Sequence, residues 1–147
     1  MKRSKRLSPV IELAEKETKA ALTKVGEVNT LWLQDKHQLD ELHVYKGEYL
    51  AKFRQGDDLV MSAQKVLELR RFLAQLDQAI EAQKQQVNNR LHQLEQQREV
   101  WKQARTKEKV MQSLIDRYKD EESHKEARQE QLDNDERNTS QWLRRRN

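Results

Sequence analysis

The apolar residues in the first third of the chain recur in a heptad pattern. From Leu7 to Phe53, alternating steps of four and three residues join fourteen positions, and eleven of these are apolar. The fourteen positions are Leu7, Ile11, Ala14, Thr18, Ala21, Val25, Val28, Trp32, Asp35, Leu39, Leu42, Lys46, Tyr49 and Phe53. Such spacing places them along one side of a helix and is typical of a coiled coil. Ser8 can cap the free amides and Pro9 suits the first helical position, so we predict a helix over about residues 9–54.

A second heptad pattern follows the strongest turn signal of the chain. Gly56 with Asp57 and Asp58 forms that signal, and Ser62 can cap the helix that follows it. Sixteen positions then continue in the same steps, and twelve of them are apolar. They are Val66, Leu69, Leu73, Leu76, Ile80, Gln83, Val87, Arg90, Leu94, Gln97, Trp101, Ala104, Glu108, Met111, Ile115 and Tyr118. We predict a turn over about residues 55–62 and a helix over about residues 63–118.

The two patterns together predict the fold class. Two heptad helices joined by a short turn fold back on each other, which gives an all-α, antiparallel coiled-coil hairpin that takes up residues 1–147 as a single domain. Pairing Phe53 with Val66 beside the turn brings Leu7 near Gln112, so the second helix is expected to overhang the first.

The last part of the chain has few residues to bury. Beyond Tyr118, the 29 residues 119–147 include four apolar ones, namely Ala127, Leu132, Trp142 and Leu143. We therefore expect residues 119–147 to be a weakly packed extension of the second helix.

The amino-acid composition further restricts the kind of protein that the chain can be. Charged residues make up 37% of the chain, glycine occurs three times and proline once, which disfavours a large globular core. The chain has no cysteine, so it has neither a disulfide framework nor a thiolate site, and this suits a reducing cytosol. It also lacks the run of about 18 uncharged residues that a membrane span needs. These features lead us to expect a soluble, cytoplasmic protein.

The net charge of +4 comes from the two ends of the sequence. Seven of the 29 basic residues lie within residues 2–6 and 144–146, and the remaining 22 are outnumbered by 25 acidic residues. Basic ends of this kind are either solvated tails or sites that dock onto an acidic partner.

Residues suited to catalysis or metal binding are not grouped. His37, His43, His92 and His124 are too far apart for a metal cluster, and no cysteine assists them. The three glycines are isolated, so they form no phosphate-binding loop. We therefore expect no enzymatic activity, no metal and no cofactor.

One stretch of the second helix carries an additional apolar stripe. Phe72, Leu76, Ala79 and Gln83 follow four-three-four steps beside the heptad positions. Either Phe72 covers a wide interhelical interface from its flank, or the stripe is a docking surface for a partner near the turn.

Several motifs of the chain resemble those of the FliJ family of the flagellar type III export apparatus. They are "LAEKE" at residues 13–17, Gly26 with Glu27, the tyrosine spacing of Tyr45 and Tyr49, and above all "FLAQLDQAIEAQ" at residues 72–83. The resemblance covers most of the chain and is weakest after Tyr118. It implies a helical hairpin similar to the central stalk of rotary ATPases.

The resemblance also implies a function in bacterial flagellum biogenesis and motility. The resemblance implies a non-enzymatic coupling component of the export apparatus. Such a component associates with the export ATPase hexamer, contacts the cytoplasmic domain of the export gate and handles empty export chaperones. Such a protein is cytoplasmic and is attached to the inner membrane through the export apparatus. The alternative is a generic coiled-coil adaptor, or a helical arm with basic ends that binds nucleic acid, although nucleic acid is the less expected partner.

The resemblance implies two sets of residues as contacts with partner proteins. The stripe Phe72, Leu76, Ala79 and Gln83 is the implied contact with the export gate. The implied residues at the ATPase end are Leu13, Ala14, Glu17, Met111, Ile115 and Tyr118.

Overall fold

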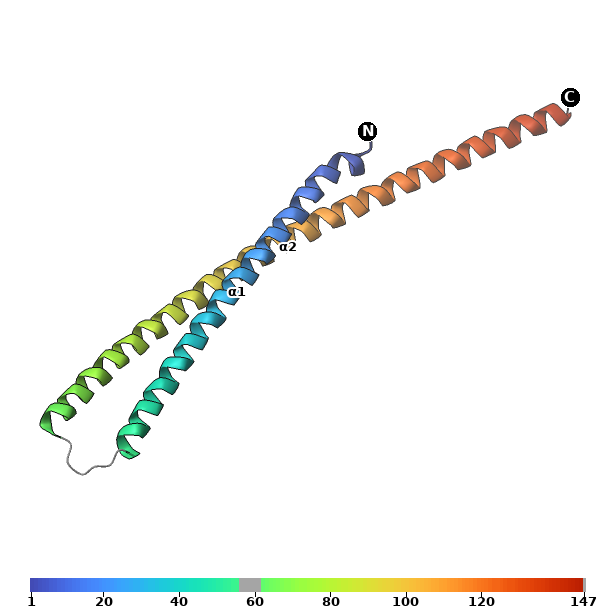
Figure 1. Cartoon of the computed structure of the whole chain (residues 1–147). Coiled ribbons are helices and arrows are strands. Elements are labelled where there is room, and N and C mark those ends of the chain that lie inside the picture. Colours follow the sequence, from blue (N-terminus) through green and yellow to red (C-terminus); the bar gives the residue numbers. More distant parts are fainter. Residues whose placement is uncertain (56–61, 147) are drawn as a thin grey trace. The chain divides into compact units, whose positions relative to one another are not determined.

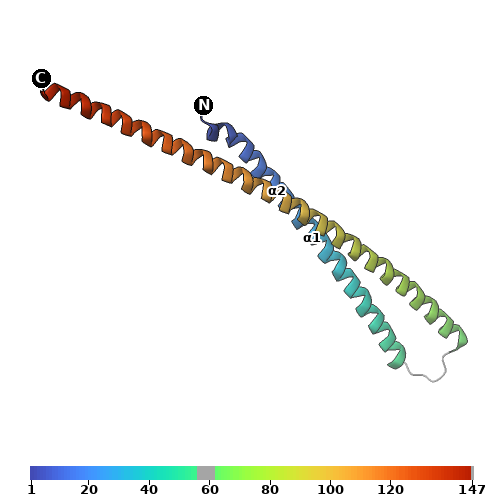
Figure 2. The same ribbon diagram turned by 180° about the vertical axis from the view of Figure 1, so that it is seen from behind.

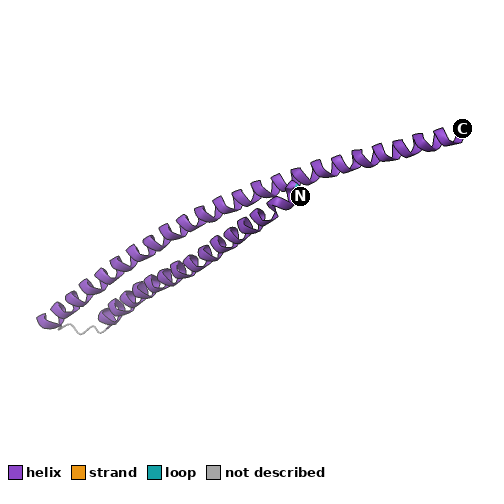
Figure 3. Cartoon of the chain, turned by 90° about the horizontal axis from the view of Figure 1, so that it is seen from above, coloured by secondary structure: helices purple, strands orange, loops and turns teal. Residues whose placement is uncertain are grey.

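The computed structural model describes residues 1–55 and 62–146, and it contains two helices. Helix α1 is Arg3–Gln55 and helix α2 is Ala63–Arg146 (Figure 1). The described part of the chain has no strand, as the purple ribbons of Figure 3 show. The predicted all-α class is therefore confirmed, and the two long helices pack against each other as an antiparallel hairpin (Figure 2).

The hairpin divides into two compact units. The central unit is Ala21–Trp101, and the terminal unit combines Met1–Ala20 with Lys102–Asn147. Each unit contains one segment of α1 and one of α2. The two units are described separately below.

The seam between the helices includes all of the predicted heptad positions. All fourteen positions in α1 and all sixteen in α2 are buried or half-buried. In the central unit the seam centres on Ala21, Val28, Leu76, Ile80 and Leu94, and the side chain of Leu94 is fully buried. In the terminal unit it centres on Ile11, Ala14 and Ile115. Both heptad patterns are thus confirmed as the packing faces of the helices.

The start of α1 differs from its prediction. The helix begins at Arg3, and Pro9 lies inside it rather than at its first position. The backbone carbonyl of Lys2 accepts a hydrogen bond from the Arg6 amide at 3.2 Å, so a helical turn already exists before the predicted cap at Ser8. A carboxylate on α2 also binds the amide and hydroxyl of Ser4, as described below. This contact from α2 caps the first turn of α1 and stabilises it. The local sequence signals had placed that turn before the helix.

The start of α2 agrees with its prediction. Ser62 Oγ accepts a hydrogen bond from the Lys65 amide at 3.3 Å, which is the geometry of a helix cap. The predicted turn residues Gly56, Asp57 and Asp58 lie outside the described residues.

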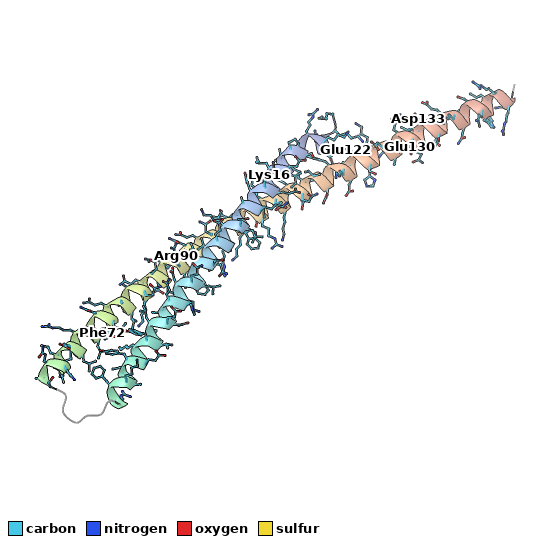
Figure 4. All side chains as sticks on the ribbon, viewed as in Figure 1. Lys16, Phe72, Arg90, Glu122, Glu130 and Asp133 are labelled. Atoms are coloured by element: carbon cyan, nitrogen blue, oxygen red, sulfur yellow. The ribbon has the colours of Figure 1, made fainter. Side chains whose placement is uncertain are left out.

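The C-terminal part of α2 is a single helix without a partner helix. Every residue from 123 to 146 is exposed, and the side chains of Glu130 and Asp133 project from an unaccompanied ribbon (Figure 4). The predicted overhang is therefore present, and it remains helical to Arg146.

The predicted pairing of the helices is displaced in the terminal unit. That pairing would place Ser4 opposite Ile115, whereas Ser4 bonds to Glu122, one heptad further along α2. A heptad pattern repeats after seven residues, so the pattern alone does not distinguish pairings that differ by a heptad.

Candidate partner-binding surfaces

A cluster of four aromatic rings lies at one end of the central unit. The ring of Phe72 on α2 packs against Tyr49 with 4.3 Å between ring centroids and against Tyr45 at 6.1 Å. Tyr49 also contacts Phe53, at 5.1 Å. The ring of Phe72 therefore bridges to α1 and covers the seam from its flank, which is the first of the two interpretations of the stripe (Figure 4). Tyr45 is 49% exposed, so the cluster also presents an aromatic surface to solvent.

The other members of the stripe divide between seam and surface. Leu76 is 7% exposed and belongs to the core of the central unit. Gln83 Nε2 donates hydrogen bonds to the Asp35 carbonyl at 2.9 Å and to Gln38 Oε1 at 3.3 Å, which ties its amide to α1. Ala79 is exposed. The side chain of Ala79 is thus the most accessible member of the stripe.

Polar contacts interrupt the apolar seam of the central unit. Arg90 Nε lies 3.0 Å from Asp35 Oδ2, and these side chains are only 27% and 15% exposed. Nearer the aromatic cluster, Lys46 Nζ lies 2.6 Å from Asp77 Oδ1. These two pairs connect α1 to α2 in a specific alignment.

The residues implied for the ATPase end lie in the terminal unit, and their exposure differs widely. Ala14 and Ile115 are each 4% exposed and form part of the seam. Met111 and Tyr118 are half-buried, and the guanidinium of Arg3 lies 5.6 Å from the centroid of the Tyr118 ring. Glu17 forms an exposed ion pair with Lys107 at 3.7 Å. Leu13 is 58% exposed and is the member of this set with a freely accessible apolar side chain.

Glu122 makes a contact between the helices that the heptad patterns, as predicted, did not include. Its carboxylate accepts hydrogen bonds from the Ser4 hydroxyl at 2.7 Å and the Ser4 amide at 3.1 Å. These two bonds, the hydroxyl bond first, hold the pKa of Glu122 below its ordinary value. Ser4 and Glu122 continue the heptad steps of their helices, three residues before Leu7 and four after Tyr118. Extending both patterns by one step could have identified the pair.

An ion pair also joins the start of the chain to α2. Lys2 Nζ donates a hydrogen bond to Glu126 Oε1, and this bond raises the pKa of Lys2 above its ordinary value. Lys2 and the first α1 residues Arg3 and Ser4 therefore attach the start of the chain to α2.

The described residues contain neither a candidate metal site nor a candidate membrane span. Within residues 1–55 and 62–146, no three histidine, cysteine, aspartate or glutamate side chains are grouped closely enough to hold a metal ion. In the same part of the chain, neither helix has a stretch that is long and apolar enough to cross a membrane.

These features define the class of the protein as a two-helix antiparallel coiled-coil hairpin with an unpaired helical extension. The family model FliJ, described as flagellar FliJ protein, matches residues 3–147. The chain therefore belongs to the FliJ family, as its motifs predicted, and it is a flagellar export-related protein. No curated protein matches the chain.

Proposed function

We propose that the chain is a non-enzymatic coupling component of the flagellar type III export apparatus. In this role it connects the export ATPase hexamer to the cytoplasmic domain of the export gate and handles empty export chaperones. It acts in the cytoplasm, attached to the inner membrane through the apparatus. The observation that carries this proposal is the family match over residues 3–147, which includes both helices of the hairpin and the extension.

The contact with the export gate is assigned to the stripe Phe72, Leu76, Ala79 and Gln83 in the central unit. Leu76 is buried and Gln83 is bonded to α1, so they position the surface rather than touch the gate directly. Ala79 and the aromatic cluster around Phe72 supply the accessible contacts, because Ala79 is exposed and Tyr45 beside Phe72 is half exposed. Aromatic side chains dominate the binding energy of small interfaces, which supports a docking role for this cluster.

The contact with the ATPase is assigned to the terminal unit. Leu13 is the accessible apolar side chain there, and Glu17 lies on the same helix one turn further along. Ala14 and Ile115 are buried in the seam of the same unit, and Met111 and Tyr118 are half-buried there. The ATPase would therefore contact Leu13 and Glu17 directly. The buried residues of this set would contribute by holding the two helices in place.

Two variants, each with one exposed alanine replaced by arginine, test the assignment of the gate contact without disturbing the core. Ala79→Arg places a long charged side chain on the stripe, whereas Ala74→Arg adds the same side chain at an exposed position off the stripe. Titration against the purified cytoplasmic domain of the export gate should show at least about tenfold weaker binding for Ala79→Arg, and unchanged binding for Ala74→Arg. Equal binding by both variants would place the gate contact elsewhere.

A pull-down from cytosol tests the proposal as a whole. Copurification of the chain with the hexameric export ATPase is the expected result. Salt-sensitive binding of RNA without any association with the ATPase or the gate would instead favour a helical arm that binds nucleic acid.

A further inference from the structure

The extension of α2 is strongly polarised in charge. Residues 120–136 carry eight acidic and two basic side chains. Residues 137–146, termed the basic segment from here on, carry four arginines and no acidic residue. The arginines are Arg137, Arg144, Arg145 and Arg146. Within the extension, residues 120–136 are thus net negative and residues 137–146 are net positive.

The basic segment also exposes large apolar side chains. Trp142 is 56% exposed and Leu143 is 51% exposed, although the surrounding helix is almost entirely polar. The guanidinium of Arg146 lies 5.0 Å from the centroid of the Trp142 ring. Among the described residues, no acidic side chain forms an ion pair with Arg144, Arg145 or Arg146. The arginines are therefore available to an external anion.

We infer that the basic segment binds the surface of an anionic lipid bilayer. Tryptophan is enriched where headgroups meet acyl chains, because its ring is apolar and its N–H is polar. Adjacent arginines bind lipid phosphates and are attracted by the negative potential of an anionic leaflet. Trp142 and Leu143 supply the apolar contact, and Arg144, Arg145 and Arg146 supply the charge. The inference does not depend on the proposed export function.

Two features favour a lipid surface over a nucleic acid. The guanidinium of Arg146 lies over one face of the Trp142 ring, so only the other face is open to a stacked base. The acidic residues 120–136 directly precede the basic segment and would repel a phosphate chain that followed the helix. A bilayer can instead engage the basic segment alone.

Vesicle binding by the full chain tests the inference. The protein is mixed with vesicles of phosphatidylcholine and phosphatidylglycerol in equal parts, and bound protein is measured by flotation. Replacing Arg144, Arg145 and Arg146 together by glutamine should lower the partition coefficient by at least about tenfold, because each arginine near an anionic surface contributes favourably. Binding should also be lost at about 0.5 M salt and on pure phosphatidylcholine vesicles.

A matched variant controls for net charge. Arg70, Arg71 and Lys84 are exposed on α2 in the central unit, and replacing them by glutamine removes the same charge. This variant should bind the anionic vesicles within about twofold of the original chain. Equal losses in the two triple variants would overturn the inference, because binding would then follow overall charge.

Three further outcomes would also overturn it. The first is the absence of binding to the anionic vesicles by the original chain. The second is RNA binding that the arginine triple variant abolishes while vesicle binding is unaffected. The third is a salt-sensitive dimer, detected by light scattering, in which the acidic part of one extension occupies the basic segment of a second copy and prevents vesicle binding. Trp142→Gln together with Leu143→Gln provides a positive check, because it should weaken vesicle binding while leaving its salt dependence in place.

Discussion

Asp35 and Arg90 form an ion pair within the apolar seam of the central unit, with 3.0 Å between Asp35 Oδ2 and Arg90 Nε. Both residues occupy heptad positions, and Gln83 Nε2 adds a hydrogen bond to the Asp35 carbonyl. Polar groups in a coiled-coil seam specify alignment at a cost in stability, because other pairings would leave the charges buried without a partner.

Asp35→Ala should therefore destabilise the chain. The substitution leaves Arg90 partly buried without its counter-charge, and we expect a loss of roughly 1–3 kcal/mol in the free energy of unfolding, less than for a fully buried pair. Combining Asp35→Leu with Arg90→Leu should restore most of the stability, because both charges are then removed. Urea unfolding followed by circular dichroism measures both effects. If Asp35→Ala unfolds like the original chain, the pair acts as an ordinary surface contact.

The aromatic cluster leads to a second prediction. Phe72→Ala should cost roughly 1–3 kcal/mol of unfolding free energy, because the ring covers the seam without being fully buried. A double-mutant cycle with Tyr49→Ala should give a coupling energy of about 0.5–1.5 kcal/mol. Leu67→Ala is the control, because Leu67 is 50% exposed on the same helix and its truncation should have little effect. A coupling energy near zero would show that the two rings do not stabilise each other.

Amide hydrogen exchange should distinguish the extension from the seam. Residues 123–146 form a helix that no second helix covers, so their amides should exchange rapidly. The amide of the fully buried Leu94 should exchange far more slowly. The comparison is made by mass spectrometry on the purified monomer. Comparable protection of the two segments would reveal a packing surface for the extension.

The cap formed by Glu122 should depend on pH. Its pKa is held below the ordinary value of 4.5, so the folded state binds a proton at this site less readily than the unfolded state. The stabilising contribution is therefore present above that ordinary value and is lost as the pH falls through the lowered pKa. The protection factors of the amides of residues 4–8, which correct for the slower intrinsic exchange in acid, should fall on acidification. Glu122→Gln should weaken this pH dependence. Glu121→Gln serves as the control, because Glu121 pairs locally with Arg117 instead.

The heptad residues could be predicted because their signal is local and periodic. The heptad positions from Leu7 to Tyr118 repeat at the spacing of a helix face, and burial of such a face is the main source of stability in a chain this polar. The cap at Ser62 was predictable for a similar reason, because a serine side chain and a nearby amide decide it.

Other features depend on residues that are distant in the sequence. Pro9 suggested a helix start because the local signals could not include the carboxylate of Glu122 on the other helix. The position of Phe72 was ambiguous for the same reason, since only the pairing of the helices brings Tyr45 and Tyr49 to its ring. The alignment of the terminal unit remained undetermined because heptads are interchangeable until polar partners such as Ser4 and Glu122 select one pairing.

The antiparallel pairing also has a consequence for the order in which the contacts form during folding. The Lys46–Asp77 contact joins residues 31 apart in the sequence, whereas the Ser4–Glu122 contact joins residues 118 apart. Closing the larger loop directly from the unfolded chain costs about 1 kcal/mol more in entropy than closing the smaller one. Refolding is therefore expected to begin in the central unit and to reach Ser4 last. Substitutions near Phe72 should then slow refolding, and loss of the Glu122 cap should mainly speed unfolding.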